Sequence, residues 1–97
     1  MREVVITDNA KEDIEHIASF LKIQFSNQVK TDFLVNLSEK LLFIEKLPFM
    51  YPKSIKNERV RRCVIHKNTV CHYEVTDEHI IILSVLDARI DPDTLRF

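Results

Sequence analysis

The chain has 97 residues, of which 45% are hydrophobic and 30% charged, and its formal net charge is -1. This length and composition predict one globular domain spanning residues 1–97, rather than a disordered or fibrous chain. No segment approaches the roughly 20 apolar residues of a transmembrane helix, and the N-terminus lacks a secretory signal. With only two cysteines, we expect a cytoplasmic protein without a disulfide framework. The absence of glycine excludes Gly-rich phosphate-binding loops.

The first half of the chain predicts a short strand and two helices. Residues 4–6 form an apolar run, and Thr7 or Asp8 can cap the helix that follows. Apolar residues then recur at spacings of three and four on both sides of Ser26 and Asn27, which break the pattern and can cap a second helix. Pro48 ends this helix because its ring cannot continue it. The apolar positions are Ala10, Ile14, Ile17, Ala18, Leu21 and Phe25, then Val29, Phe33, Leu37, Leu41, Ile44 and Leu47.

The second half predicts a loop followed by three strands. Residues 48–57 contain two prolines and favour an ordered connection. The apolar period then changes to two, and the expected strands are 59–66, 69–76 and 79–86. Tight turns at 67–68 and 77–78 would join them. The predicted fold is α+β in the order β-α-α-β-β-β, with a helical hairpin on one face of a small, mainly antiparallel sheet.

Strand alternation predicts which residues lie on each face of that sheet. A two-residue turn at 77–78 puts Tyr73 opposite Ile82. The face toward the helices would then hold Cys71, Tyr73, Val75, Ile80, Ile82 and Leu86. The other face would hold Val64, Val70, His72, Ile81, Leu83 and Val85. Because this second face is strongly apolar, we expect the C-terminal tail, a second copy or another protein to cover it at Ile81, Leu83 and Val85.

Positive charge gathers in one stretch of the chain. Residues 50–73 hold six Lys/Arg and one acidic residue, whereas the chain as a whole is slightly acidic. Such a block favours contact with an acidic partner or with phosphates, and a solvated edge is the alternative. The partner-binding candidates in it are Arg61, Arg62 and Lys67.

The histidines predict neither a metal site nor a cofactor. His16, His66, His72 and His79 lack the spacing of known metal-binding motifs. His66 and His72 would approach each other across the hairpin that strands 59–66 and 69–76 form, beside Arg62. Two imidazoles next to an arginine suit acid–base chemistry on a phosphodiester, although two polar side chains on a sheet surface are the commoner arrangement.

The order of elements and several short motifs resemble the RelE/ParE superfamily of toxins from bacterial type II toxin–antitoxin systems. The resemblance covers almost the whole chain and implies a toxin that a cognate antitoxin neutralises. The expected assembly is a toxin–antitoxin hetero-oligomer or a homodimer. The motifs are Ala10-x-x-Asp13-Ile14, Leu47-Pro48, Tyr51-Pro52, Arg61-Arg62, Tyr73-Glu74-Val75, Ile80-Ile81-Ile82-Leu83 and Asp87-x-Arg89-x-Asp91-Pro92.

The two branches of this superfamily imply different targets. RelE-like members are implied to cut messenger RNA on the ribosome, with an arginine where this chain has Val70. That activity would leave Arg61, Arg62, His66, His72 and Arg89 to bind and cleave. ParE-like members are implied to inhibit DNA gyrase by binding alone, and the Asp87-x-Arg89 ending resembles theirs, although histidine is frequent at the first position. We therefore favour a non-enzymatic, gyrase-binding toxin with Arg89 in the contact. The alternatives are a ribosome-dependent ribonuclease and a non-toxic, toxin-derived binding module.

Overall fold

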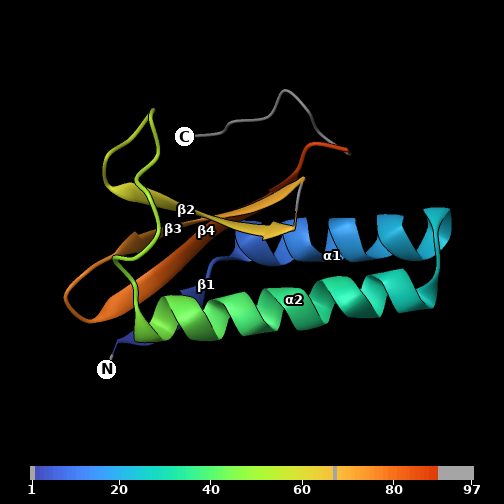
Figure 1. Ribbon diagram of the computed structural model, residues 1–97, viewed down its shortest axis with the longest axis horizontal. Helices are drawn as coiled ribbons and strands as arrows, with labels where there is room; N and C mark the ends of the chain where they lie inside the picture. The colour runs from blue at the N-terminus through green and yellow to red at the C-terminus, as the bar shows by residue number, and fades with distance from the viewer. Residues whose placement is uncertain (1, 67, 90–97) are drawn as a thin grey trace.

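The structure is a computed structural model that describes residues 2–66 and 68–89. Its elements are β1 (Glu3–Ile6), α1 (Asp8–Gln24), α2 (Asn27–Lys46), β2 (Val60–His66), β3 (Thr69–Val75) and β4 (His79–Asp87). The two helices lie side by side on one face of the sheet, where α1 packs on β4 and α2 packs on β2 (Figure 1). The predicted α+β fold and its element order are confirmed.

Both helices begin where the sequence predicts. The Thr7 side chain accepts a hydrogen bond from the Ala10 amide, and the Ser26 side chain accepts one from the Val29 amide. Each cap satisfies a backbone donor that has no partner within the first turn. The helix α2 ends at Lys46, just before Pro48. Neither α1 nor α2 is long and apolar enough to cross a bilayer, and the same holds throughout residues 2–66 and 68–89.

The strands form one mixed sheet in the order β1-β4-β3-β2. The strand β1 runs parallel to β4, and the other neighbours are antiparallel, so the sheet is mainly antiparallel as predicted. Tyr73 pairs with Ile82 and Val75 with Ile80, which is the register that a turn at 77–78 requires. The N-terminal strand therefore occupies an edge beside the last strand.

An irregularity in β4 corrects the predicted faces of that strand. Tyr73 pairs with Ile82 but His72 pairs with Ser84, so Leu83 is an extra residue, as in a β-bulge. The extra residue reverses the alternation that follows it. Val85 consequently pairs with Cys71 and is 1% exposed in the core, and Leu86 takes the opposite face. The face of the sheet that is turned away from the helices is called the free face below. The predictions that Val85 belongs to the free face and Leu86 to the helix-facing side are wrong.

Side chains from the start of α1 satisfy the backbone at this bulge. The Asp13 carboxylate accepts a hydrogen bond of 3.0 Å from the Val85 amide. The Asn9 amide donates to the Leu83 carbonyl at 3.1 Å, and the Thr7 hydroxyl donates to the Ile82 carbonyl at 2.9 Å. A bulge takes backbone groups out of the ladder, and buried backbone groups need partners. The motif that contains Asp13 thus joins the helix layer to the sheet.

The core lies between the helices and one face of the sheet. Tyr73 is fully buried there, and its hydroxyl donates a hydrogen bond of 2.7 Å to the Pro48 carbonyl. Cys63 and Cys71 are register partners on adjacent strands, and both are buried free thiols, as expected of small core residues. The other buried apolar residues of this core are Ala10, Ile17, Leu21, Phe33, Leu37, Ile44, Ile65, Ile80, Ile82 and Val85.

Candidate functional site

Arg61 is engaged by the loop that connects α2 to β2. Its Nη1 atom donates hydrogen bonds to the Tyr51 carbonyl at 2.7 Å and to the Phe49 carbonyl at 3.3 Å. Its guanidinium carbon also lies 5.1 Å from the centre of the Phe49 ring, within the range of a cation–π contact. Arg61 therefore anchors a loop, and alternation places its side chain on the opposite side of β2 from that of Arg62.

Arg62 and His72 face each other on the side of the sheet away from the helices. They are register partners on β2 and β3, and Arg62 is exposed whereas His72 is buried. The His72 Nδ1 atom lies 3.4 Å from the Ser84 hydroxyl. Burial, with a smaller contribution from the charge of Arg62, lowers the pKa of His72 to about 4. The imidazole is therefore neutral at neutral pH and is a poor proton donor there.

The lowered pKa of His72 predicts how stability changes with pH. The unfolded chain takes up a proton near pH 6.5, whereas the folded chain does so only near pH 4. The free energy of unfolding should therefore be constant above about pH 6.5 and fall by about 3 kcal/mol as the pH drops to about 4. Urea denaturation against pH measures this fall, and His72→Gln should remove most of it. An NMR titration of His72 that gives a pKa above 6 would contradict the prediction.

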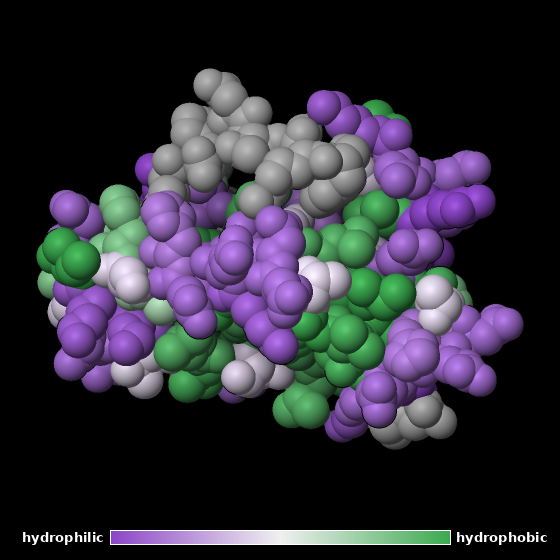
Figure 2. Space-filling model, turned by 180° about the vertical axis from the view of Figure 1, so that it is seen from behind, coloured by the Kyte–Doolittle hydropathy of each residue, from purple (hydrophilic) through white to green (hydrophobic). Residues whose placement is uncertain are grey.

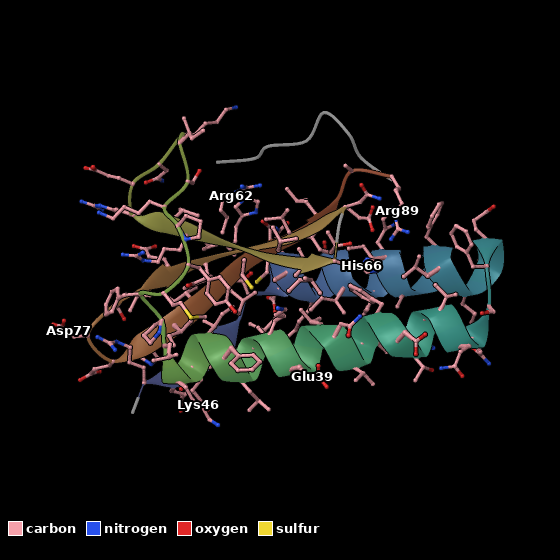
Figure 3. The ribbon with its side chains drawn as sticks, in the orientation of Figure 1. Glu39, Lys46, Arg62, His66, Asp77 and Arg89 are labelled. Atoms are coloured by element: carbon pink, nitrogen blue, oxygen red, sulfur yellow. The ribbon has the colours of Figure 1, made fainter. Side chains whose placement is uncertain are left out.

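The predicted pair of His66 and His72 does not form. His66 pairs with Thr69 at an irregularity near the end of the hairpin, whereas His72 pairs with Arg62. Three residue steps along β3 separate Thr69, the partner of His66, from His72, which corresponds to about 10 Å. Figure 3 shows Arg62 on the side of the sheet away from the helices, and His66 toward the end of the molecule where Arg89 lies. His66 lines a pocket with residues of the helices, whereas His72 is buried beside Arg62, so the two imidazoles belong to different surfaces.

His66 and Arg89 line a pocket of about 360 Å³ between the helices and the end of the β2–β3 hairpin. Its apolar walls come from α1 and the residue that follows it, from the first half of α2 and from one residue of β2. Its polar residues come from α2, β2, β3 and the segment that follows β4. The apolar residues are Leu21, Phe25, Val29, Phe33 and Ile65, and the polar ones are Asp32, Asn36, His66, Thr69 and Arg89. Such a pocket can receive an apolar side chain of a partner and hold a polar group beside it.

A buried carboxylate holds Arg89 at this pocket. Asp87 is 2% exposed, and it accepts hydrogen bonds from the Arg89 amide at 2.8 Å, from Arg89 Nη2 at 2.7 Å and from the Thr69 hydroxyl at 2.7 Å. Burial by itself would raise the pKa of Asp87, but these hydrogen bonds and the charge of Arg89 outweigh it and lower the pKa. The hydrogen bond to Asp87 correspondingly raises the pKa of Arg89. Asp87 is thus a positioning residue for an arginine that stays partly exposed.

The free face of the sheet keeps part of its expected apolar character. Ile81 and Leu83 are half-buried, and Val5 on the edge strand β1 is 37% exposed. From behind, the view is toward the β1 edge of the sheet rather than onto the free face, and apolar surface gathers in the half of the molecule that holds β1 (Figure 2). Lys67 lies outside the described residues, as does the part of the Asp87-x-Arg89 motif after Arg89.

Two features of the site escaped the sequence analysis. The pocket was missed because its lining comes from four separate elements and from Phe25 and Arg89, which lie outside them. The role of Asp87 was missed because the carboxylate was compared with a histidine instead of being matched with Thr69, its partner across β3 and β4. That pairing depends on the bulge at Leu83, so the sequence carried no signal for it. Throughout the described part of the chain, no three His, Cys, Asp or Glu residues are placed to hold a metal ion.

Known structures share this fold at low sequence identity. The ParDE toxin–antitoxin structure from P. aeruginosa matches with a TM-score of 0.73 at 14% identity, over 90% of this chain and 96% of that one. A chain of the E. coli DinJ–YafQ complex matches with a TM-score of 0.66 at 8% identity, over 94% of this chain and 98% of that one. A copper-bound mutant toxin from Helicobacter pylori matches with 0.64 at 18%, over 94% and 99%. Identities this low support the fold alone.

Comparison with family models shows the family of this chain, whereas the structures show its fold alone. No curated protein matches this chain significantly. The family model described as the ParE toxin of the type II toxin–antitoxin system, parDE, matches residues 4–92, which cover the described helices and strands except Glu3 at the start of β1. The resemblance drawn from the motifs is thereby confirmed, and this chain belongs to the family of ParE toxins of type II toxin–antitoxin systems.

Proposed function

We propose that this toxin acts by binding and inhibiting DNA gyrase, without cutting nucleic acid, and that a cognate antitoxin neutralises it. The observation that supports action without cleavage is that the candidate ribonuclease residues do not all meet at one site. Arg61 is engaged by a loop, and His72 is buried in the middle of β3 with a pKa of about 4. His66 lies near the turn of the hairpin, where it lines the pocket with Arg89. Membership of the ParE family supports gyrase as the target.

Cleavage of RNA needs groups that converge on one phosphate. A base must activate the 2′-hydroxyl, a cation must stabilise the phosphate, and an acid must protonate the leaving oxygen. On the free sheet face, Val70 stands where RelE-like members are implied to have arginine, and Arg62 is the exposed candidate left there. His66 and Arg89 lie apart from it, at the pocket between the helices and the hairpin. Losing one charge-stabilising group typically costs about 10²–10³ in rate. This arrangement supports binding over catalysis.

The pocket beside Arg89 is the proposed contact with gyrase. Binding energy at protein interfaces concentrates where an apolar side chain fills a pocket beside an arginine or an aromatic residue. Arg89 combines a partly exposed guanidinium with a fixed orientation, because Asp87 binds two of its nitrogens. We propose that a gyrase side chain enters between Phe25 and Ile65 while an acceptor on gyrase binds Arg89.

The free sheet face is the proposed contact with the antitoxin. Two of the structural neighbours are described as toxin–antitoxin systems or complexes, which supports a partner of this kind. Apolar antitoxin side chains would cover Ile81 and Leu83, and acidic ones would pair with Arg62 and Lys67. Arg61 contributes less to this surface, because it binds the loop before β2.

Expression of the toxin without its antitoxin separates the candidate functions. We expect growth arrest with no messenger RNA cleavage in a translating extract, at toxin levels that stop growth. The double variant His66→Ala/His72→Ala should arrest growth as well as the unchanged chain, provided that circular dichroism shows it folded. Cuts at fixed codon positions that vanish in this variant would contradict the proposal and favour the ribonuclease. Absence of any arrest would favour a non-toxic binding module.

A further inference from the structure

The face of α2 that is turned away from the sheet carries apolar side chains that the domain leaves exposed. Val35, Leu42 and Phe43 are 50%, 57% and 51% exposed. Phe33, Leu37 and Ile44 of the same helix are buried on its other side. Val35 and Leu42 are seven residues apart, so they lie nearly in line along the helix. The helix is thus apolar on both faces, although the sheet covers one.

Two opposite charges stand on the same exposed side of α2. Glu39 precedes Leu42 by three residues, and Lys46 follows Phe43 by three residues. Figure 3 shows both side chains directed away from the sheet. They are about 10.5 Å apart along the axis, farther than the spacing of an ion pair within one helix. Among residues 2–66 and 68–89, the salt bridges are those of His79 with Glu3 and of Arg89 with Asp87, so neither charge is paired.

We call Val35, Glu39, Leu42, Phe43 and Lys46 the α2 ridge, and we propose that it docks a second copy of this chain as an antiparallel helix pair. A two-fold axis between Leu42 and Phe43 puts Leu42 beside the partner's Phe43. The same axis puts Glu39 beside the partner's Lys46, and Lys46 beside the partner's Glu39. One register therefore joins both apolar side chains and both charges.

The symmetry of the charges is the reason to choose a second copy over another partner. A two-fold interface uses the same patch twice, so the patch must be complementary to itself. Glu39 and Lys46 lie at equal distances on either side of the apolar centre and have opposite signs, which meets this requirement. The gyrase contact and antitoxin contact proposed above use other surfaces, so this pairing does not depend on the proposed function. A patch of this size implies weak association, so measurements should reach about 1 mM.

Sedimentation equilibrium of the purified full-length chain tests whether the ridge associates. We expect a reversible monomer–dimer equilibrium that Leu42→Ser weakens about 30-fold, because each dimer loses two half-exposed leucines. Ile23→Ser is the matched control, since Ile23 is an apolar residue of α1 that is 77% exposed and lies off the ridge. It should leave the equilibrium unchanged.

Charge reversal tests the antiparallel register. Glu39→Lys and Lys46→Glu should each weaken self-association about tenfold, because each replaces two attractive pairs with two repulsive ones. An equimolar mixture of the two variants should restore association, since a lysine then faces a glutamate at both positions of the mixed dimer. Raising the salt concentration should reduce all of these differences.

Three results would overturn the proposal. The first is a chain that stays monomeric at about 1 mM. The second is association that Leu42→Ser and Ile23→Ser weaken equally. The third is a mixture of Glu39→Lys and Lys46→Glu that associates no better than either variant alone, because the proposed register requires recovery. A monomeric chain whose binding to its antitoxin is weakened by Leu42→Ser would assign the ridge to the antitoxin instead.

Discussion

Replacing Arg89 with alanine is expected to abolish growth arrest by the toxin. Arg89 is the partly exposed cation of the pocket that we propose as the gyrase contact, and hydrogen bonds from its guanidinium to Asp87 fix its orientation. Truncating a central interface arginine typically costs 2 kcal/mol or more, which is about 30-fold in affinity. The measurement is colony formation after induction in cells that lack the antitoxin.

Controls must separate target binding from folding, because Arg89 also stabilises Asp87. Arg59→Ala is the matched variant, since Arg59 is an exposed arginine outside the pocket, and it should leave the arrest intact. Thermal melting must show that Arg89→Ala is folded at the growth temperature. Arg89→Lys keeps the charge but loses the two-nitrogen contact with Asp87, so it should be intermediate. A folded Arg89→Ala variant that arrests growth normally would remove the pocket from the mechanism.

Replacing Asp87 with alanine is expected to lower the free energy of unfolding by about 3 kcal/mol. The change leaves the buried Thr69 hydroxyl without its hydrogen-bond acceptor and removes the salt bridge between Asp87 and Arg89. The lowered pKa of Asp87 gives this loss a pH dependence. The folded chain holds the carboxylate charged to a lower pH than the unfolded chain does. Its stabilising contribution is therefore complete above the ordinary aspartate pKa and disappears as the pH falls through the folded value.

Urea denaturation of the two proteins checks this prediction. Asp77→Ala is the control, because Asp77 lies exposed in the turn between β3 and β4 and should change stability by less than about 0.5 kcal/mol. The difference between the unchanged chain and Asp87→Ala should shrink at acidic pH. An Asp87→Ala variant as stable as the control at neutral pH would show that the hydrogen bonds to Thr69 and Arg89 contribute no net stability.

The predictable part of the fold rests on local signals. The two caps, the stop before Pro48 and the turn at 77–78 each depend on residues within a few positions of one another, and the structure has all of them. The bulge at Leu83 depends on Asp13, which is 70 residues away in sequence. No pattern within the sequence of β4 predicts the extra residue. Strict alternation along the strand therefore assigned Val85 to the free face, which is wrong because of the bulge.

The candidate site was harder to predict than the fold, for two physical reasons. Arg61 and Arg62 are neighbours in sequence, but successive residues of a strand point to opposite faces, so the two cannot form one cationic patch. This alternation was available from the sequence. The burial of His72 was not, because it depends on how neighbouring strands and side chains cover that position. The local pattern therefore gave no indication of its lowered pKa.

The most direct test of gyrase as the target is a supercoiling assay with purified gyrase and the purified toxin. We predict that the toxin inhibits the supercoiling of relaxed plasmid, that His66→Ala/His72→Ala inhibits equally, and that folded Arg89→Ala inhibits about 30-fold less at equal concentration. Adding the cognate antitoxin should restore supercoiling. Unchanged supercoiling at toxin concentrations that cleave messenger RNA in a translating extract would contradict gyrase inhibition.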